Sequence, residues 1–393
     1  MVNILKSKTI IPKFAVLPVL LLFIILACNR EQQQNKKIID YSNGSTKDAS
    51  KKNNVTATEL PLTEKTYISA PHKIKVAQIP DNAAIIFYKP LKPPKTIEEA
   101  VKGGNEIFVM NADGSQVTQI TFDSPKQYEH VAVSWDERYI AYDVIPVSGS
   151  GERTQGEPWL GIIDIDKGEE WKVTGFSGAG GGGVDWDNDG FLYFSAPQSP
   201  FGSGGLFKMR PDGTEAKAVY PSDPKLSGDP GLSNDGKVIV ALKRIENAKI
   251  PGRSGTYTYL QVWLVNTDGS NPRLVYDPTT KPEFETDRNG QNQLIGTGTD
   301  PEVSPDKKQI LLSLGDSSGF TRLYFVGVGA TEKKVLTPEG VFAAVPDWQG
   351  DKILFGGQSG SIAVINSDGT GFKYLLEPDA AAGVPKWIPL HVR

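Results

Sequence analysis

Residues 106–143 read EIFVMNADGSQVTQITFDSPKQYEHVAVSWDERYIAYD, and the pattern of this stretch decides the fold. It contains four short apolar runs, at 107–110, 117–120, 131–135 and 139–142. Asp113-Gly114 separates the first two runs. Asp-Gly between short apolar runs is a strong hairpin signal, because the turn needs a positive φ that glycine adopts without strain. The stretch therefore predicts four short β-strands in series.

The same pattern recurs along the chain, at 206–241, 261–313 and 362–376. Four short strands per unit, repeated at intervals of roughly 40 to 60 residues, are typical of a β-propeller blade. We therefore predict an all-β fold, a six-bladed β-propeller. A seven-bladed ring is the alternative, because residues 245–300 are numerous enough to contain further irregular strands.

The recurring units resemble the TolB-type propeller repeat. Its first half, an apolar run followed by Asp-Gly-[Ser/Thr], is matched by 113–115, 212–214, 268–270 and 368–370. Its second half is matched best by Pro230-Gly231-Leu232-Ser233 and by 301–306, which read PEVSPD. The resemblance covers roughly residues 72–393. It implies a propeller that docks on partners of the cell envelope, as TolB-like proteins do in the periplasm.

The C-terminal segment Pro385-Lys386-Trp387-Ile388-Pro389 has the start of a repeat unit but no strand after it. We expect it to pair with the blade formed by residues near 74–121, which lacks such a start. This closure would remove two exposed sheet edges. It also predicts that the fold is sensitive to C-terminal truncation.

The N-terminal residues have the features of an export signal. Lys6, Lys8 and Lys13 precede an apolar stretch at 14–26, which is too short to span a membrane. Residues 25–28, Ile-Leu-Ala-Cys, resemble a bacterial lipobox, and Cys28 is the single cysteine of the chain. Cys28 is therefore the predicted lipidation site. The alternative is an ordinary cleaved signal or an uncleaved membrane anchor, with Cys28 incidental.

We accordingly divide the chain into a lipoprotein signal peptide at 1–27, a flexible polar linker at 28–70 and a TolB-like β-propeller at 71–393. The linker is rich in Gln, Asn, Ser, Thr and Lys, a composition that buries little apolar surface. The predicted location is the periplasmic side of a bacterial membrane, held by a lipid anchor at the outer membrane or cell surface.

Overall composition is that of a globular protein, with 38% hydrophobic residues, 22% charged residues and a formal net charge of −4. The charge does not indicate a nucleic-acid-binding protein. Residues 315–319, GDSSG, match the Gly-x-Ser-x-Gly motif of α/β-hydrolases. That motif requires a helix after the serine, whereas residues 320–325 have a strand pattern, so we interpret the segment as a hairpin loop.

One position of the repeat lies just ahead of each inner strand, where the mouth of the central channel is expected. Its occupants are His130, Gly183, Asp229, Asp300, Val345 and Val384. His130, Asp229 and Asp300 are candidate ligands of a divalent metal, or an electronegative mouth for a cationic ligand. The alternative is that Asp229 and Asp300 cap turns before proline and that His130 is a polar rim residue.

These observations support three functional hypotheses. The first is a membrane-anchored binding or scaffolding module for a protein or glycan of the cell envelope, with no cofactor. The second is a propeller enzyme, a polysaccharide lyase or hydrolase with a metal at the channel mouth. Oligogalacturonate lyases, propellers with similar repeats, hold an axial metal with several histidines, whereas this chain has three histidines in all. The third is an accessory subunit of an exported complex.

Overall fold

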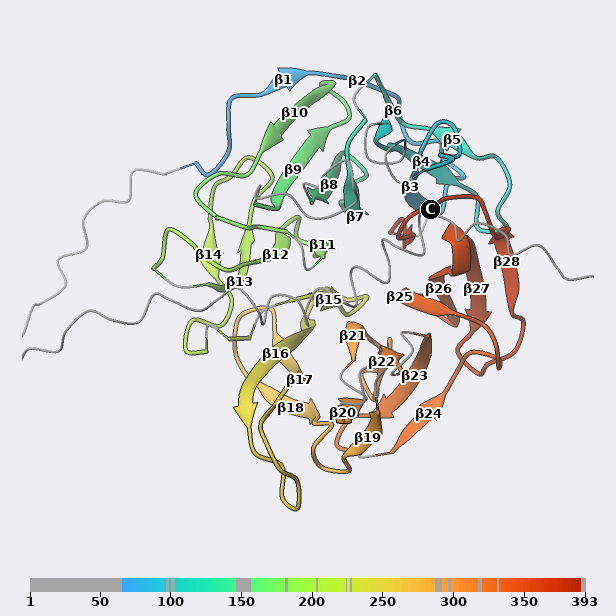
Figure 1. Cartoon of the computed structure of the whole chain (residues 1–393). Helices are drawn as coiled ribbons and strands as arrows, with labels where there is room; N and C mark the ends of the chain where they lie inside the picture. Colours follow the sequence, from blue (N-terminus) through green and yellow to red (C-terminus); the bar gives the residue numbers. More distant parts are fainter. Residues whose placement is uncertain are drawn as a thin grey trace, which may run out of the picture.

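The computed structural model describes residues 66–389 apart from 97–98, 100–102, 124, 146–156, 181–182, 203, 224, 227, 287–291, 296–297, 317–319 and 331. Within these residues, six β-sheets of four or five strands surround a central axis, and one edge strand of each sheet lies nearest that axis (Figure 1). The predicted six-bladed β-propeller is confirmed. The predicted signal peptide, Cys28 and most of the predicted linker lie outside the described residues. No described helix is long and apolar enough to cross a membrane.

Blades 1 to 3 come from the N-terminal half and from the C-terminal strand. Blade 1 is formed by β29 (Lys386–Trp387), β3 (Ile85–Lys89), β4 (Glu106–Met110) and β5 (Thr118–Gln119). Blade 2 is formed by β7 (Tyr128–Val133), β8 (Tyr139–Val144), β9 (Trp159–Asp164) and β10 (Glu169–Lys172). Blade 3 is formed by β11 (Val184–Trp186), β12 (Leu192–Ala196), β13 (Gly205–Met209) and β14 (Lys217–Ala218).

Blades 4 to 6 follow in chain order. Blade 4 is formed by β15 (Gly231–Leu232), β16 (Val238–Ala248), β17 (Tyr257–Asn266) and β18 (Arg273–Tyr276). Blade 5 is formed by β21 (Thr299–Val303), β22 (Gln309–Gly315), β23 (Thr321–Gly327) and β24 (Lys333–Val335). Blade 6 is formed by β25 (Ala343–Gln349), β26 (Lys352–Gly357), β27 (Ile362–Asn366) and β28 (Lys373–Leu376), with a short 3-10 turn, η2 (Gln358–Gly360), between β26 and β27.

The outer hairpin of four blades is set by the Asp-Gly turn that the sequence singled out. In the β4–β5 turn, Gly114 has φ +89° and the backbone N–H of Ser115 donates to the Asp113 carboxylate at 2.9 Å. Equivalent side-chain-to-backbone hydrogen bonds recur in the turns at 212–214, 268–270 and 368–370. Each turn therefore uses the glycine for its positive φ and the aspartate to accept the next backbone donor.

The hydrophobic core lies between neighbouring blades. Strand β3 illustrates this: Ile85 and Phe87 pack toward blade 6, whereas Ile86 and Tyr88 pack toward blade 2. Successive side chains of a strand point to opposite faces, so a strand covered on both faces has apolar residues at every position. This explains why the inner runs of the sequence are continuously apolar rather than alternating. Each blade thus depends on both neighbours for its burial.

Ring closure occurs as expected. Strand β29 pairs antiparallel with β3, with Lys386 opposite Ile86 and Trp387 opposite Ile85. The backbone N–H of Trp387 donates to the Asp347 carboxylate, and its indole N–H donates to the Asp347 carbonyl at 3.2 Å. The two-residue strand is therefore held to blade 1 by its backbone and to blade 6 by Asp347.

Two further β-structures lie outside the four-stranded blades. An N-terminal strap runs along the outer edge: β1 (His72–Lys73) pairs with β10, and β2 (Lys75–Val76) pairs with β6 (Thr121–Phe122). Tyr67 and Ile68, inside the predicted linker, pack against the cluster between blades 2 and 3. The second β-structure is a hairpin of β19 (Glu283–Thr286) and β20 (Asn292–Ile295) between blades 4 and 5.

Trp387→Ala tests the importance of the closing strand. Trp387 packs against the apolar cluster between blades 6 and 1 and donates two hydrogen bonds to Asp347. We expect the variant to lose about 3 kcal/mol of unfolding free energy, measured by urea denaturation. Leu274→Ala, at a residue 43% exposed on outer strand β18, is the control and should cost about 0.5 kcal/mol. Equal losses in the two variants would contradict the closing role.

Candidate functional site at the propeller axis

The six positions expected at the channel mouth meet at the axis. His130, Gly183, Asp229, Asp300, Val345 and Val384, which we call the first ring, all line one cavity of about 30 Å³. Every blade contributes one residue, and the structure brings together the six positions that the repeat register aligned. His130 comes from β7 and Asp300 from β21, while Asp229 lies two residues before the first residue of β15. The cavity has room for one or two groups the size of a water molecule.

The backbone of the first ring is strained at several positions. Asp229, Asp300 and Val345 have φ values of +37°, +48° and +49°. Positive φ is unusual for any residue with a Cβ and especially for a β-branched valine. At Asp300 and Val345 the strain coincides with irregular pairing of β21 and β25 with their neighbours. Such bulges redirect a side chain, here toward the axis, and strain of this kind often accompanies function.

His130 is oriented by a buried carboxylate that the sequence did not single out. Asp143, on the neighbouring strand β8, is fully buried. Its carboxylate accepts the backbone N–H of His130 at 2.6 Å and lies 3.1 Å from the Nδ1 atom of the same residue. Nε2 is then the ring nitrogen left to face a ligand. A Cβ on Gly180 would lie 2.4 Å from the Asp143 Cβ, so a glycine at this position allows the chain to pass Asp143.

The electrostatics of the first ring favour an extra cation. Burial opposes a charged imidazole, but Asp143, Glu129 and Asp229 together raise the pKa of His130 to about 9. Burial, and then the neighbouring Asp300, raise the pKa of Asp229 to about 7. A raised carboxyl pKa means that negative charge at Asp229 is not fully compensated by its surroundings.

A second ring of charges follows two residues further along the same segments. It contains Asp185, Glu302, Asp347 and Lys386. The Lys386 ammonium lies 3.0 Å from an Asp185 carboxylate oxygen and donates to the Val184 carbonyl at 3.4 Å. Burial lowers the pKa of Lys386, but the three carboxylates raise it more, so the net direction is upward. Burial, followed by Asp185, raises the pKa of Asp347 to about 6, although Lys386 lowers it.

Sequence reasoning missed this second ring, although a signal was present. Because side chains two apart share a face of a strand, stepping two residues from each mouth position reaches Asp185, Glu302, Asp347 and Lys386. Besides the first ring, Glu302 and Lys386, the residues that line the cavity are apolar: Val131, Val184, Pro230, Pro301, Pro346 and Pro385. The site is thus an apolar passage with carboxylates at both levels.

The predicted metal ligands do not form a compact set. Among the described residues, the group of three whose ligating atoms all lie within 4.8 Å of one another is Glu129, His130 and Asp143. Asp229 and Asp300 line the same cavity as His130 but are not part of that group.

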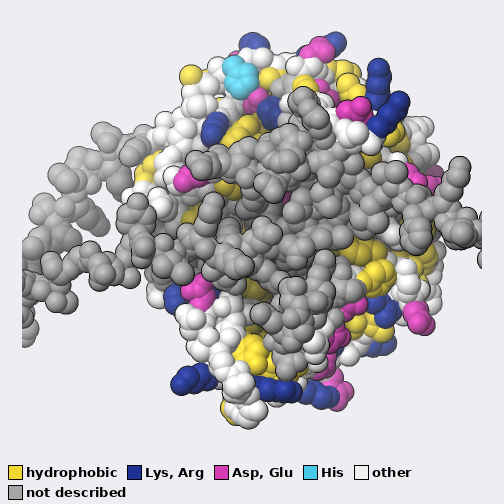
Figure 2. All heavy atoms as spheres, in the orientation of Figure 1, with side chains coloured by type: hydrophobic (Ala, Val, Ile, Leu, Met, Phe, Trp, Pro, Cys, Tyr) yellow, Lys and Arg dark blue, Asp and Glu magenta, His cyan; other side chains and the backbone are white. Residues whose placement is uncertain are grey.

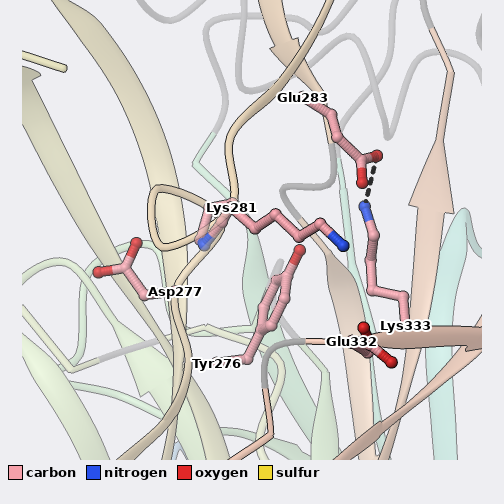
Figure 3. Close-up of a pocket in the computed structure, with 7 residues that line it drawn as sticks. Tyr276, Asp277, Lys281, Glu283, Glu332 and Lys333 are labelled. Atoms are coloured by element: carbon pink, nitrogen blue, oxygen red, sulfur yellow. Dashed lines mark hydrogen bonds and ion pairs between the residues drawn. The ribbon is translucent and has the colours of Figure 1, made fainter. Parts of the chain in front are cut away.

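A second hollow, of about 150 Å³, lies between the outer strands of blades 4 and 5 (Figure 3). It is lined by Tyr276, Asp277, Pro278, Lys281, Glu283, Glu332 and Lys333. Lys333 forms a 2.9 Å ion pair with Glu283, which ties the β19–β20 hairpin to blade 5. Acidic and basic groups both line this hollow, and both kinds also lie along the margin of the face shown in Figure 2. The axial cavity, built by all six blades, is therefore the stronger candidate site.

Comparison with known proteins shows which solved structures have a similar fold. No family model and no curated protein sequence matches the chain. Among solved structures, TolB from Acinetobacter baumannii is similar with a TM-score of 0.53 and 17% identity, over 79% of this chain and 68% of that one. The chain has a TolB-like β-propeller fold. A chain in a nidogen/laminin complex is also similar, with a TM-score of 0.51 and 11% identity, over 78% of this chain and 98% of that one.

At these identities the likeness establishes the TolB-like propeller and not its partners. The role of each axial residue in this TolB-like propeller is therefore inferred from its contacts in the structure. Lys386, on the closing strand, supplies the cation of the second ring, so we expect its replacement to have a large effect on stability.

Lys386→Met should destabilise the TolB-like propeller in a pH-dependent way. The methionine keeps the volume but leaves Asp185, Glu302 and Asp347 without their ammonium, at a cost of about 3 kcal/mol near pH 8. Carboxyl groups with raised pKa values stabilise the fold at low pH and lose that contribution as pH rises through the folded pKa. The loss of unfolding free energy relative to the unsubstituted protein should therefore be smaller at pH 5 than at pH 8.

The measurement is urea denaturation at both pH values. Lys352→Met is the matched control, because Lys352 is 47% exposed and its carboxylate partner Asp351 is 78% exposed. A pH-independent deficit in Lys386→Met would show that lost packing, not lost charge, is responsible.

Proposed function

We propose that this protein is a lipid-anchored extracytoplasmic β-propeller that binds a protein or glycan partner of the cell envelope through its axial cavity. The observation that carries the proposal is the convergence of Asp229, Asp300 and His130, from three different blades, on one cavity. A rigid ring that presents such a group at its centre suits recognition of a cationic part of a partner.

Two further observations support a binding module. The TolB-like fold is shared with a chain from a nidogen/laminin complex, which is an assembly of proteins. The N-terminal sequence, with basic residues, an apolar stretch and Cys28 after Ile25-Leu26-Ala27, supports export and lipidation. A protein held at a membrane surface meets envelope partners at high local concentration. An accessory subunit of an exported complex is one form of this function.

Cys28→Ser tests the anchor. We expect the unsubstituted protein to fractionate with membranes and to incorporate a radiolabelled fatty acid, because acyl chains on Cys28 supply the membrane affinity. The Cys28→Ser variant should incorporate no label and appear in the soluble extracytoplasmic fraction.

Affinity isolation from detergent-solubilised native membranes should recover a partner in stoichiometric amount. Labelling that persists in the variant, or a chain that is not exported, would overturn the anchoring part of the proposal.

A metal-dependent enzyme, such as a polysaccharide lyase or hydrolase, is the second candidate. The pairing of His130 with the buried Asp143 favours it, because metal-ligating histidines commonly donate their other ring nitrogen to a carboxylate. His130, Asp229 and Asp300 would then hold the ion.

Metal content separates this candidate from the first. The purified protein and its His130→Ala variant are analysed by elemental mass spectrometry. One equivalent of a divalent metal that is lost in His130→Ala would support the metal site, because the variant lacks the imidazole ligand. Substoichiometric metal in both proteins would argue against it. Asp268→Asn, at an exposed outer hairpin, is the control variant.

A further inference from the structure

We propose that the axial cavity binds a primary ammonium group at the end of an alkyl chain, as in a lysine side chain, with Asp229 and Asp300 as its first carboxylates and Glu302 beneath them. This inference rests on the proposed partner-binding function and specifies the chemical group that the partner inserts. Four observations on the described residues carry it.

The first observation is an excess of carboxylates. The charged side chains that line the cavity are the carboxylates Asp229, Asp300 and Glu302 and the cations His130 and Lys386. His130 is paired with Asp143 at 3.1 Å, and Lys386 is paired with Asp185 at 3.0 Å. Neither of these two carboxylate partners lines the cavity. Charge within the cavity therefore favours a further positive group.

The second observation is the state of Glu302. This residue lines the cavity and is only 7% exposed. Within the described ranges its carboxylate has no direct hydrogen bond or ion pair, and Lys386, whose ammonium is paired with Asp185, acts on it at longer range. A buried carboxylate without a donor is costly, so a ligand that supplies donors gains binding free energy there. Glu302 lies two residues after Asp300 on β21, which places the two carboxylates at successive levels of the passage.

The third observation is that the protein already holds an ammonium in this passage. Lys386 extends its side chain among the carboxylates of the second ring and reaches Asp185 at 3.0 Å. The same ring architecture therefore accommodates an ammonium surrounded by carboxylates one level away. The first ring repeats that arrangement with Asp229 and Asp300 but has no lysine of its own.

The fourth observation is the apolar lining. Apart from Gly183 and the five charged side chains, the cavity wall consists of valine and proline residues, among them Val131, Pro230 and Pro346. Methylene groups gain from contact with such a wall, whereas a divalent ion gains only from oxygen or nitrogen ligands. The volume of about 30 Å³ admits a compact ammonium and the adjoining methylene. A planar guanidinium, with five donors in a rigid fork, is larger and less well matched to it.

The experiment uses the full chain in detergent and n-butylammonium as the probe. Binding is followed by NMR through the imidazole Cε1–H signal of His130, assigned with a His130→Gln variant. We expect n-butylammonium to cause a saturable change in the chemical shift of this signal. The affinity for n-butylguanidinium should be about tenfold weaker, because the planar guanidinium does not fit the cavity. Asp229→Asn and Asp300→Asn should each weaken n-butylammonium about tenfold, since each removes a charged acceptor. Asp268→Asn should leave the affinity unchanged.

Three results would overturn the inference. The first is the absence of a saturable shift, and the second is binding of n-butylguanidinium that is equal to or tighter than that of n-butylammonium. The third is displacement of n-butylammonium by Ca²⁺ at a concentration below that of the n-butylammonium. Thermal unfolding of each variant shows whether it is folded, and the two aspartate variants provide independent tests.

Partner isolation distinguishes failure of this inference from failure of the proposed function. A partner captured equally by the unsubstituted protein and by Asp229→Asn would leave the binding module standing and remove the ammonium site. Capture of no partner, with n-butylammonium binding intact, would count against the binding module alone.

Discussion

The structure depends on the fact that each sheet is apolar on both faces. Strand β3 directs Ile85 and Phe87 to one neighbour and Ile86 and Tyr88 to the other, and the remaining blades follow the same rule. A single blade of this kind cannot bury its surface alone, because one four-stranded sheet has no partner for either face. Only a closed ring gives every sheet two neighbours. The closing strand β29 is thus a requirement of the core as well as of the hydrogen bonding.

Closure also determines the chemistry of the axis. Lys386 belongs to β29, and its ammonium compensates Asp185, Glu302 and Asp347 in the second ring. The first ring has no equivalent lysine, and its imidazole is engaged by Asp143. The two levels of the passage therefore differ in charge, although they are built from the same six segments. This difference makes the first ring the place where a cationic group from outside can be accommodated.

Much of this arrangement follows from local sequence signals. The Asp-Gly turns, the six blades and the pairing of the C-terminal segment with the first blade are all visible in the repeat, because they depend on short-range backbone preferences. The first ring was also predictable, since equivalent positions of a repeat occupy equivalent places around the axis. His130, Asp229 and Asp300 line one cavity for that reason.

Other features depend on contacts that the sequence does not display. Asp143 reaches His130 because the two residues are cross-strand partners of β7 and β8, and the apolar pattern alone does not show which residues face each other across this hairpin. The strap formed by His72 and Lys73 pairs with Glu169 and Glu170, almost a hundred residues away, and its polar sequence resembles the linker before it. Glu302 has the sequence context of an ordinary strand residue, and only the assembled ring places its carboxylate in the axial cavity.

The position of β29 has a consequence for the order of events during synthesis. Every other described strand leaves the ribosome before it, yet it forms the innermost strand of the first blade. Until Trp387 arrives, the inner edge of β3 remains open and is free to pair with another chain. From the synthesis of β3 until β29 is made, the nascent protein thus carries one unpaired inner edge, which exposes it to intermolecular pairing during that interval.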